Sequence, residues 1–231
     1  MLYFCRKGLT QMIFSPKSSL IMMETNKMIA SQLLHIDAIK LSPDVPFTWA
    51  SGWNSPIYCD NRKTLSYPEV REIIKQEFAR LIREMYPDAE GIAGVATGAI
   101  AHGVLVADLL NLPFIYVRPD PKSHGLGNQI EGAFKPGQKF VVIEDLISTG
   151  GSSLAAVRSL KDANVEVMGM LAIFSYGFTQ SEENFERERV KLTVLSDYAN
   201  LLELAIQGGY ISEKQLMSLQ EWRKSPHTWN R

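Results

Sequence analysis

The chain has 231 residues and a mass of 25.9 kDa, which fits one domain of ordinary size. Hydrophobic residues make up 45% and charged residues 21%, which excludes a collagen-like, low-complexity or wholly disordered chain. The 24 basic and 25 acidic residues nearly balance. No overall positive field therefore favours nucleic acid or an anionic membrane, and we expect neither as a partner.

The two cysteines and the first residues of the chain suggest where the protein works and where its core begins. Cys5 and Cys59 lack the number and spacing of a disulfide framework or a zinc site, so we expect a reducing compartment and a cytoplasmic protein. No apolar run is long enough to predict a transmembrane helix. Residues 1–22 carry no motif and no helical periodicity. We expect a non-core extension there, with an added helix or a targeting role as the alternative, and a single domain over 23–231.

The first elements are a helix, a strand-and-turn region and a second helix. Apolar residues recur at helical spacing over 28–36, which predicts the first helix. The aromatic, proline-bearing stretch 42–63 predicts short strands and turns. Ser66 and Glu69 have the spacing of a capping box. They predict the start of a long amphipathic helix that ends before Pro87.

Beyond this second helix, short apolar strands alternate with helices. Such alternation is typical of a parallel sheet covered by helices on both faces, so the predicted fold class is α/β. The expected strands are 91–95, 114–118, 140–145, 165–174 and 190–195, and the expected helices are 99–110, 152–163, 199–206 and 212–222.

One long polar segment, 119–139, interrupts this alternation. It is rich in glycine and proline, and loops of this length are usually lids, binding loops or disordered. It follows a strand that ends in Arg118, and it contains Lys122 and His124. Because ligands bind at the carboxyl ends of parallel strands, we expect these cations to face a ligand. The alternative is that they are only solvated side chains.

The most informative stretch is FVVIEDLISTGGSS, residues 140–153. An apolar strand ends in Glu144 and Asp145, and small residues over 148–152 then lead into a helix. Backbone N–H groups at such a turn and helix start can hold a phosphate. The two acids suit ribose hydroxyls or magnesium. Alone, the small-residue run could be an ordinary turn, and the acid pair could be a solvated rim. The order in which the two follow the strand makes the signal more specific.

The stretch resembles the phosphoribosyl-diphosphate (PRPP) signature of the type I phosphoribosyltransferases. Residues 116–132 look like the mobile catalytic loop of orotate phosphoribosyltransferases, and GWNSPIYCDNR, SYPEVRE and GVATGAIAHG also look like this family. The resemblance implies the type I phosphoribosyltransferase fold, a mostly parallel sheet flanked by helices. It also implies a small N-terminal hood at about 38–66 and a mobile loop over 118–139.

The resemblance further implies an activity and its partners. Such an enzyme transfers ribose 5-phosphate from PRPP to N1 of orotate, which gives orotidine 5′-monophosphate and diphosphate in de novo pyrimidine biosynthesis. The family uses Mg²⁺, which we expect to be held mainly through PRPP and not by identifiable protein ligands. It works as a homodimer in which the loop of one subunit closes over the active site of the other.

The expected site residues fall into three overlapping groups. Arg118, Lys122 and His124 supply cations where charge develops on the departing diphosphate, and with Asp145 they form the expected catalytic set. The PRPP-binding set adds Glu144, Leu146, Ile147, Ser148, Thr149, Gly150, Gly151 and Ser152, and the orotate-binding set is Ser148, Ile57 and Tyr58.

Several features depart from the family pattern. Ala50, Gly98 and Pro119 stand where some relatives carry basic residues, and the group that contacts the orotate carboxylate is open, with the backbone at 57–59 or Arg62 as candidates. Another base as acceptor and a non-catalytic PRPP-sensing regulator are the alternative functions. Some remaining aromatic and imidazole side chains have structural expectations: His102 at a helix start, His35 and His227 at the surface, and Trp222 and Trp229 packed on a helix.

Overall fold

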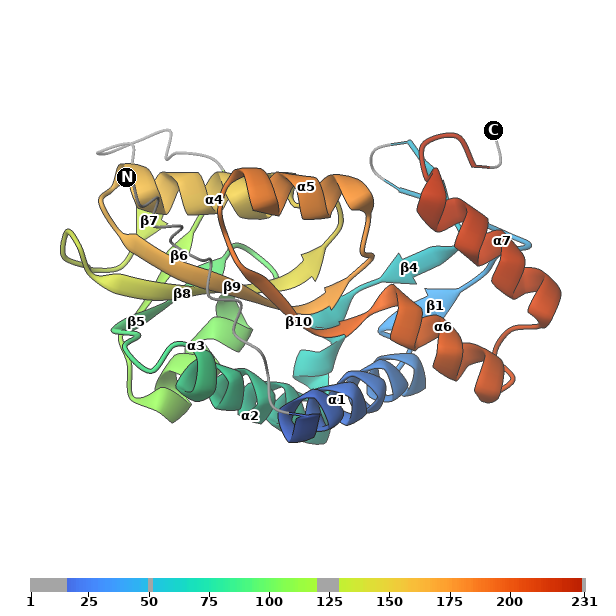
Figure 1. Cartoon of the computed structure of the whole chain (residues 1–231), viewed down its shortest axis with the longest axis horizontal. Coiled ribbons are helices and arrows are strands. Elements are labelled where there is room, and N and C mark those ends of the chain that lie inside the picture. The colour runs from blue at the N-terminus through green and yellow to red at the C-terminus, as the bar shows by residue number, and fades with distance from the viewer. Residues whose placement is uncertain (1–15, 50–51, 120–128, 230–231) are drawn as a thin grey trace, which may run out of the picture.

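A six-stranded sheet forms the centre of the molecule (Figure 1), in a computed structural model that describes residues 16–49, 52–119 and 129–229. Five strands are parallel and one edge strand is antiparallel, which confirms the α/β class. In spatial order the strands are β10 (Leu192–Asp197), β9 (Glu166–Ser175), β8 (Lys139–Ile147), β5 (Gly91–Val95), β6 (Phe114–Val117) and β7 (Ile130–Glu131).

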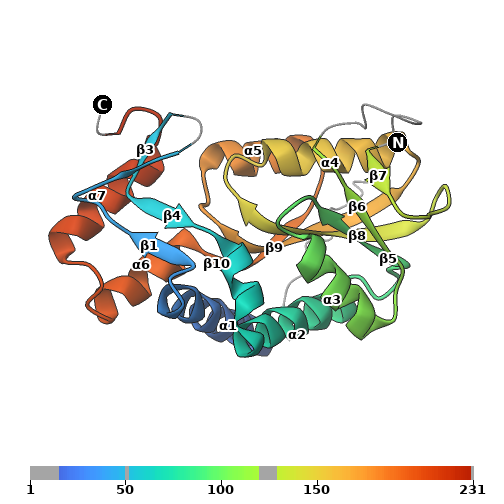
Figure 2. The ribbon, with the colours of Figure 1, turned by 180° about the vertical axis from the view of Figure 1, so that it is seen from behind.

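Helices cover both faces of the sheet (Figures 1 and 2), with α4 (Gly151–Asp162) and α5 (Thr179–Arg187) on one face. The other face carries α1 (Pro16–His35), α2 (Pro68–Met85) and α3 (Ile100–Leu110). Strand β8 shows why both faces are buried. Its Phe140 and Val142 lie in the core cluster on the α4 side, while Val141 lies in the cluster on the opposite side. Side chains alternate along a strand, so an all-apolar strand needs cover on both faces.

Helix α1 begins earlier than expected. The predicted helix over 28–36 is present, but α1 starts at Pro16 and therefore runs through the last part of the expected extension 1–22. Met22 is partly buried against the core. Once a helical turn has formed, adding residues to it is favourable even without an apolar stripe, and proline is well accepted at a helix start. Residues 1–15 lie outside the described residues.

Short antiparallel pairs and two late helices form a separate layer at one end of the sheet (Figure 2). The strands and turns predicted for 42–63 are present as β2 (Phe47–Thr48) paired with β3 (Asn54–Ser55), and as β4 (Ile57–Cys59). Strand β4 pairs with β1 (Ile39–Leu41), which lies just before the predicted stretch. The short helix η1 (Asn61–Ser66) follows. Beside them lie α6 (Tyr198–Gln207) and α7 (Glu213–Lys224).

Three local predictions were wrong. Ser66 does not cap α2, because it belongs to η1, and Tyr67 takes the cap position without a side-chain hydrogen bond. Helix α5 was missed, since among its residues only Ser181 and Phe185 are buried and no apolar stripe marks it. Strand β7 lies in the expected loop 118–139, and it pairs with β6 over only two residues.

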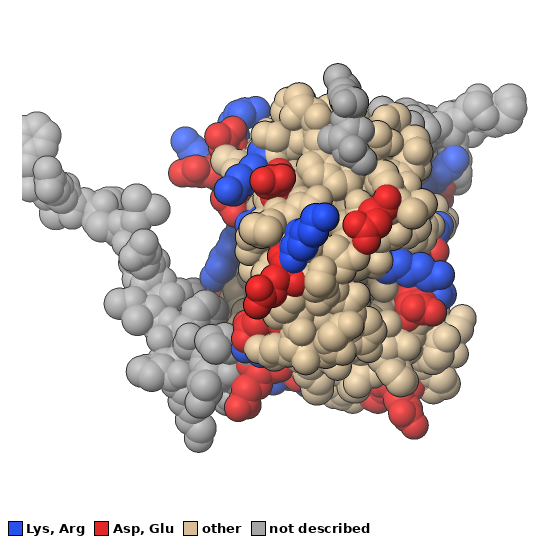
Figure 3. All heavy atoms as spheres, turned by 90° about the vertical axis from the view of Figure 1, so that its right-hand side faces the viewer, with Lys and Arg blue, Asp and Glu red and all other residues tan. Residues whose placement is uncertain are grey.

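The surface at the end that carries α6 and α7 has basic and acidic side chains interspersed (Figure 3). In the part of the chain that the structure describes, no helix has the length and apolar character needed to span a bilayer.

Candidate active site

The predicted phosphate cradle lies where β8 gives way to α4. Gly150 has a left-handed backbone with φ of 78°, and a Cβ there would overlap the Phe185 ring of α5. The first helical turn therefore begins on a residue with no side chain to occupy its N–H groups, which suits an anion. Asn184 of α5 donates through Nδ2 to the Thr149 carbonyl at 3.0 Å. The helix that the sequence analysis missed thus supports the cradle from behind.

The two acids at the end of β8 have different environments. Glu144 is 5% exposed, and its carboxylate accepts from the Ser153 hydroxyl at 2.8 Å and from the Asp145 N–H at 2.9 Å. Burial, and then the Asp145 carboxylate, raise the pKa of Glu144 above its usual range. Asp145 is half-buried, and its carboxylate lies so close to Gly98 that a Cβ there would overlap it. Glu144 therefore braces the cradle, and Asp145 is the acid that can face a ligand.

Arg118 lies at the end of β6, beside the segment 96–99. Its Nη1 is 3.6 Å from Glu131 Oε1 of β7, and its side chain is 35% exposed. A hollow of about 570 Å³ lies beside this arginine and the backbone of 96–97. Its lining residues are Ala96, Thr97, Ile100, Tyr116, Arg118, Pro119 and Glu131. Lys122 and His124 lie outside the described residues.

A smaller pocket of about 280 Å³ lies between the strand-and-turn layer and the cradle. We call it the acceptor pocket; it is lined by Thr48, Trp49, Tyr58, Cys59, Leu146, Ser148 and Tyr176. Ser148 belongs to both the cradle and this pocket, so the predicted PRPP and orotate residues meet there. Tyr58 is 42% exposed and forms one wall.

Two residues predicted at the site have buried side chains. Ile57 is 0% exposed and packs in the core, and its carbonyl already accepts from Trp49 Nε1 at 3.2 Å and from the Ser55 hydroxyl at 2.8 Å. The Ile57 side chain therefore does not line the pocket, because alternation along β4 directs it opposite to Tyr58, and only its backbone stays a candidate for the predicted contact. Ile147 is likewise fully buried in the core, so its side chain does not reach the cradle surface.

Aromatic rings from distant segments form the wall behind the acceptor pocket. The Trp49 and Tyr176 ring centroids are 5.2 Å apart, and Trp222 stands edge-on to both. Trp222 is fully buried, as expected, and donates through Nε1 to the Asn54 carbonyl at 3.3 Å. Trp49 and Tyr176 were not predicted as pocket residues. The position of Tyr176, just after the carboxyl end of β9, was the signal that could have found it.

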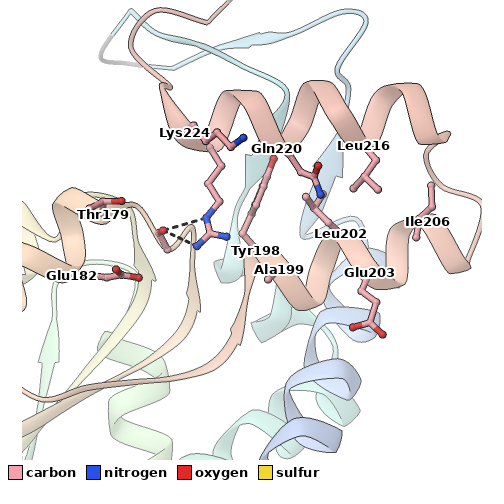
Figure 4. Close-up of a pocket in the computed structure, with 12 residues that line it drawn as sticks. Thr179, Glu182, Tyr198, Ala199, Leu202, Glu203, Ile206, Leu216, Gln220 and Lys224 are labelled. Atoms are coloured by element: carbon pink, nitrogen blue, oxygen red, sulfur yellow. Dashed lines mark hydrogen bonds between the residues drawn. The ribbon is translucent and has the colours of Figure 1, made fainter.

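A separate hollow of about 590 Å³ lies between α6, α7 and the start of α5 (Figure 4). None of the predicted site residues lines it. Arg223 donates to the Gly177 carbonyl from Nε at 3.2 Å and from Nη2 at 3.0 Å. This grip fixes the backbone directly after Tyr176 and so supports the acceptor pocket from outside.

Arg62, a candidate contact for a base carboxylate, already forms an ion pair with Asp60. Arg62 donates through Nε to Asp60 at 2.6 Å, although the Arg62 side chain is 60% exposed. The hydrogen bond from Arg62 holds the pKa of Asp60 below its usual range.

Comparison with known proteins agrees with this geometry. Residues 65–199 match the family described as phosphoribosyl transferase domain. An orotate phosphoribosyltransferase of Porphyromonas gingivalis is 60% identical over 203 residues, which cover 88% of this chain and 97% of that protein. One of Bacteroides thetaiotaomicron is 54% identical over 90% of this chain and 99% of that protein.

A solved structure shares the fold and the family name. The crystal structure of orotate phosphoribosyltransferase from Aeropyrum pernix aligns with a TM-score of 0.70 and 26% identity, over 80% of this chain and 100% of that one. Together with the cradle and the adjoining aromatic pocket, these similarities show that the chain belongs to the orotate phosphoribosyltransferases, within the phosphoribosyl transferase domain family.

Proposed function

We propose that the cradle and the acceptor pocket divide the family's reaction between them. The reaction transfers ribose 5-phosphate from PRPP to N1 of orotate, which forms orotidine 5′-monophosphate and diphosphate in pyrimidine biosynthesis. The observation that supports this division is the shared residue Ser148, which ends the cradle on one side and lines the aromatic pocket on the other. A base in the pocket would lie next to a ribose phosphate held by the cradle.

The cradle holds the 5-phosphate of PRPP in this proposal. Thr149, Gly150, Gly151 and Ser152 surround the N-terminus of α4, where backbone N–H groups and the helix dipole favour an anion. Asp145 accepts hydrogen bonds from the ribose hydroxyls. Glu144 acts through Ser153 and the Asp145 N–H, and this role replaces the direct ribose contact expected from the sequence.

Cations at the far side of the ribose assist departure of diphosphate. As the C1–O bond breaks, positive charge develops on the ribose and negative charge on the leaving diphosphate. Arg118 is placed at the hollow beside 96–99, and its planar guanidinium can bind two phosphate oxygens. Lys122 and His124 complete this set in the proposal, and a closing loop would keep water from the ribosyl centre.

The acceptor pocket binds the planar base between aromatic walls. Tyr58 and Tyr176 offer ring surfaces on which a pyrimidine can lie, and the Ser148 hydroxyl can donate to a ring carbonyl or accept from a ring N–H. The uncharged character of these walls suits orotate's ring. Arg62 is the nearby cation proposed for the carboxylate.

Magnesium and a second subunit complete the proposal. In this proposal Mg²⁺ is held mainly by PRPP oxygens, with Asp145 nearby. Among the described residues, no group of three or more His, Cys, Asp or Glu side chains could hold a metal ion. When bound, the ion would neutralise charge on the diphosphate. We also propose a homodimer in which the 118–139 loop is shared across the interface, and a cytoplasmic location.

A direct assay tests this function. Purified protein is mixed with PRPP, Mg²⁺ and either orotate, uracil or hypoxanthine, and base consumption and diphosphate release are followed. We expect orotate-dependent release that falls roughly 100-fold in Asp145→Asn, with exposed Asp88→Asn as the matched control. Release with another base would overturn the acceptor assignment, and PRPP binding without release would favour a regulator.

A further inference from the structure

A buried amide holds the backbone of the candidate catalytic acid. Asn61, the first residue of η1, is 0% exposed. Its Nδ2 donates to the Asp145 carbonyl at 2.5 Å, across 84 positions of sequence. A buried amide aimed at a strand end this far away along the chain is a tertiary contact and not part of a local turn.

The neighbouring peptide N–H of Asp145 is held as well. Glu144 accepts that N–H at 2.9 Å, and Glu144 is itself held by the Ser153 hydroxyl. Asp145 is thus gripped at its N–H by β8 and at its carbonyl by η1, while its carboxylate is half-buried beside Gly98. With both backbone groups fixed, the side chain leaves the backbone in one direction.

Asn61 is in turn fixed by two buried side chains. The Thr64 hydroxyl donates to the Asn61 carbonyl at 2.6 Å, and His102 Nε2 lies 3.2 Å from the same hydroxyl. Because Thr64 directs its hydrogen to Asn61, a neutral His102 with its proton on Nε2 completes the chain as donor. Burial lowers the pKa of His102 to about 4, so the ring is neutral at pH 7. The structural role expected for His102 is confirmed.

The same amide also contacts the acceptor pocket. Cys59 lines that pocket, and its Sγ lies 3.4 Å from Asn61 Oδ1 as donor. The amide oxygen of Asn61 therefore faces the acceptor pocket, and its amide nitrogen faces Asp145, the acid proposed to bind the ribose. A displacement of this one side chain would alter the relative placement of the two.

We propose that Asn61 is a positioning residue, which fixes the direction in which Asp145 presents its carboxylate to the ribose and its distance from the acceptor pocket. This inference rests on the proposed function, in which Asp145 contacts the ribose of PRPP. A misplaced group costs rate more than affinity, because alignment matters most in the transition state.

The test compares the full-length wild type with Asn61→Ala and Asn61→Asp. Aspartate keeps the size of asparagine but cannot donate to the Asp145 carbonyl when ionised. Asn200→Ala is the matched control, because Asn200 donates to Asp197 at the start of α6, away from the site. Values of kcat and KM for both substrates are measured along with melting temperature, and hydrogen exchange is measured at the backbone amide of Asp145.

We expect kcat to fall roughly 10- to 100-fold in both Asn61 variants, with each KM within about 3-fold. Exchange at Asp145 should accelerate about 10-fold or more in both variants and stay unchanged in Asn200→Ala. A folded Asn61→Ala with kcat within about 3-fold of wild type, or with unchanged exchange, would overturn the proposal. A loss seen only in KM would also overturn it.

Two further outcomes separate this inference from a folding defect and from failure of the proposed function. If Asn61→Ala is unfolded at the assay temperature, Thr64→Val decides, since it keeps Asn61 but removes the hydroxyl that holds it. An unchanged kcat in Thr64→Val would then contradict the proposal. A fall in kcat that is smaller than the 10- to 100-fold expected for the Asn61 variants would support it. If the wild type forms no product from orotate, the proposed function fails, and the exchange comparison still tests whether Asn61 holds Asp145.

Discussion

The proposed phosphate cradle comes from one continuous stretch of chain, whereas the proposed acceptor pocket is assembled from segments scattered along it. Asp145 and 148–152 are neighbours in sequence, and their geometry follows from a strand that turns into a helix. The pocket needs Tyr58 from β4, Tyr176 from the end of β9 and, behind them, Trp222 from α7. The cradle therefore depends on local backbone conformation, and the pocket depends on long-range packing.

This difference implies that the two parts fail in different ways. Most of the cradle's proposed contacts come from backbone N–H groups, so substitutions there should act on donor binding and turnover with small effects on folding. The pocket's rings double as core residues, so substitutions behind them should cost stability first.

Trp222→Ala should show the dependence of the pocket on packing most strongly. Removing a fully buried tryptophan is expected to lower the free energy of unfolding by about 3–5 kcal/mol. Urea unfolding measures this, with Met217→Ala on the same helix as the control, because Met217 is 59% exposed. A loss below about 1 kcal/mol would show that the pocket wall does not rest on this ring.

Lys122→Ala should act on turnover alone. We expect kcat to fall roughly 10²- to 10³-fold and the KM for PRPP to change less than about 3-fold, because the proposed contact strengthens in the transition state. Steady-state kinetics measure both values, and the exposed Lys214→Ala serves as control. A raised KM with unchanged kcat would remove Lys122 from the catalytic set.

The hydrogen-bonded residues Asn61, Thr64 and His102 lie behind the cradle and the pocket. Because His102 is buried, we expect the free energy of unfolding to fall at acid pH. The pKa of His102 is about 4 in the folded chain and about 6.5 when unfolded. The unfolded state therefore binds more protons in this window, and stability falls as pH drops from about 6.5 to about 4. The expected cost approaches about 3 kcal/mol at the acid end.

This acid sensitivity can be assigned to His102 by substitution. The free energy of unfolding is measured at several pH values. Its fall between about pH 6.5 and about pH 4 should be smaller in His102→Gln and unchanged in the control His227→Gln, whose histidine is exposed. An identical slope in wild type and His102→Gln would show that another group titrates there. Glu144, with its raised pKa, has the opposite sign and favours the folded state at acid pH.

Tyr58→Leu should give the smallest of these effects and the most selective one. Loss of a half-exposed ring wall is expected to raise the KM for orotate about 10-fold and leave stability nearly unchanged. The exposed Tyr210→Leu is the matched control. An equal rise in the KM for PRPP would mean that the ring serves the donor site.

The same contrast explains what the sequence could and could not predict. Apolar strand patterns located all five parallel strands, and the small residues after Asp145 located the strand-to-helix turn of the proposed cradle, because both signals are local. Helix α5 was missed since its contribution, Phe185 against Gly150 and Asn184 on Thr149, depends on contacts and not on periodicity. The inward position of Glu144 and the core position of Ile57 likewise follow from tertiary neighbours that no local pattern records.

Binding of PRPP in the absence of orotate tests the separation of cradle and pocket most directly. Calorimetric titration of PRPP with Mg²⁺ into wild type, Tyr58→Leu and Asp145→Asn gives three dissociation constants. We predict that Tyr58→Leu stays within about 2-fold of wild type and that Asp145→Asn binds about 10- to 100-fold more weakly, as expected for loss of hydrogen bonds to a charged group. If Tyr58→Leu weakens PRPP binding as much as Asp145→Asn does, the cradle and the pocket are not separate binding sites.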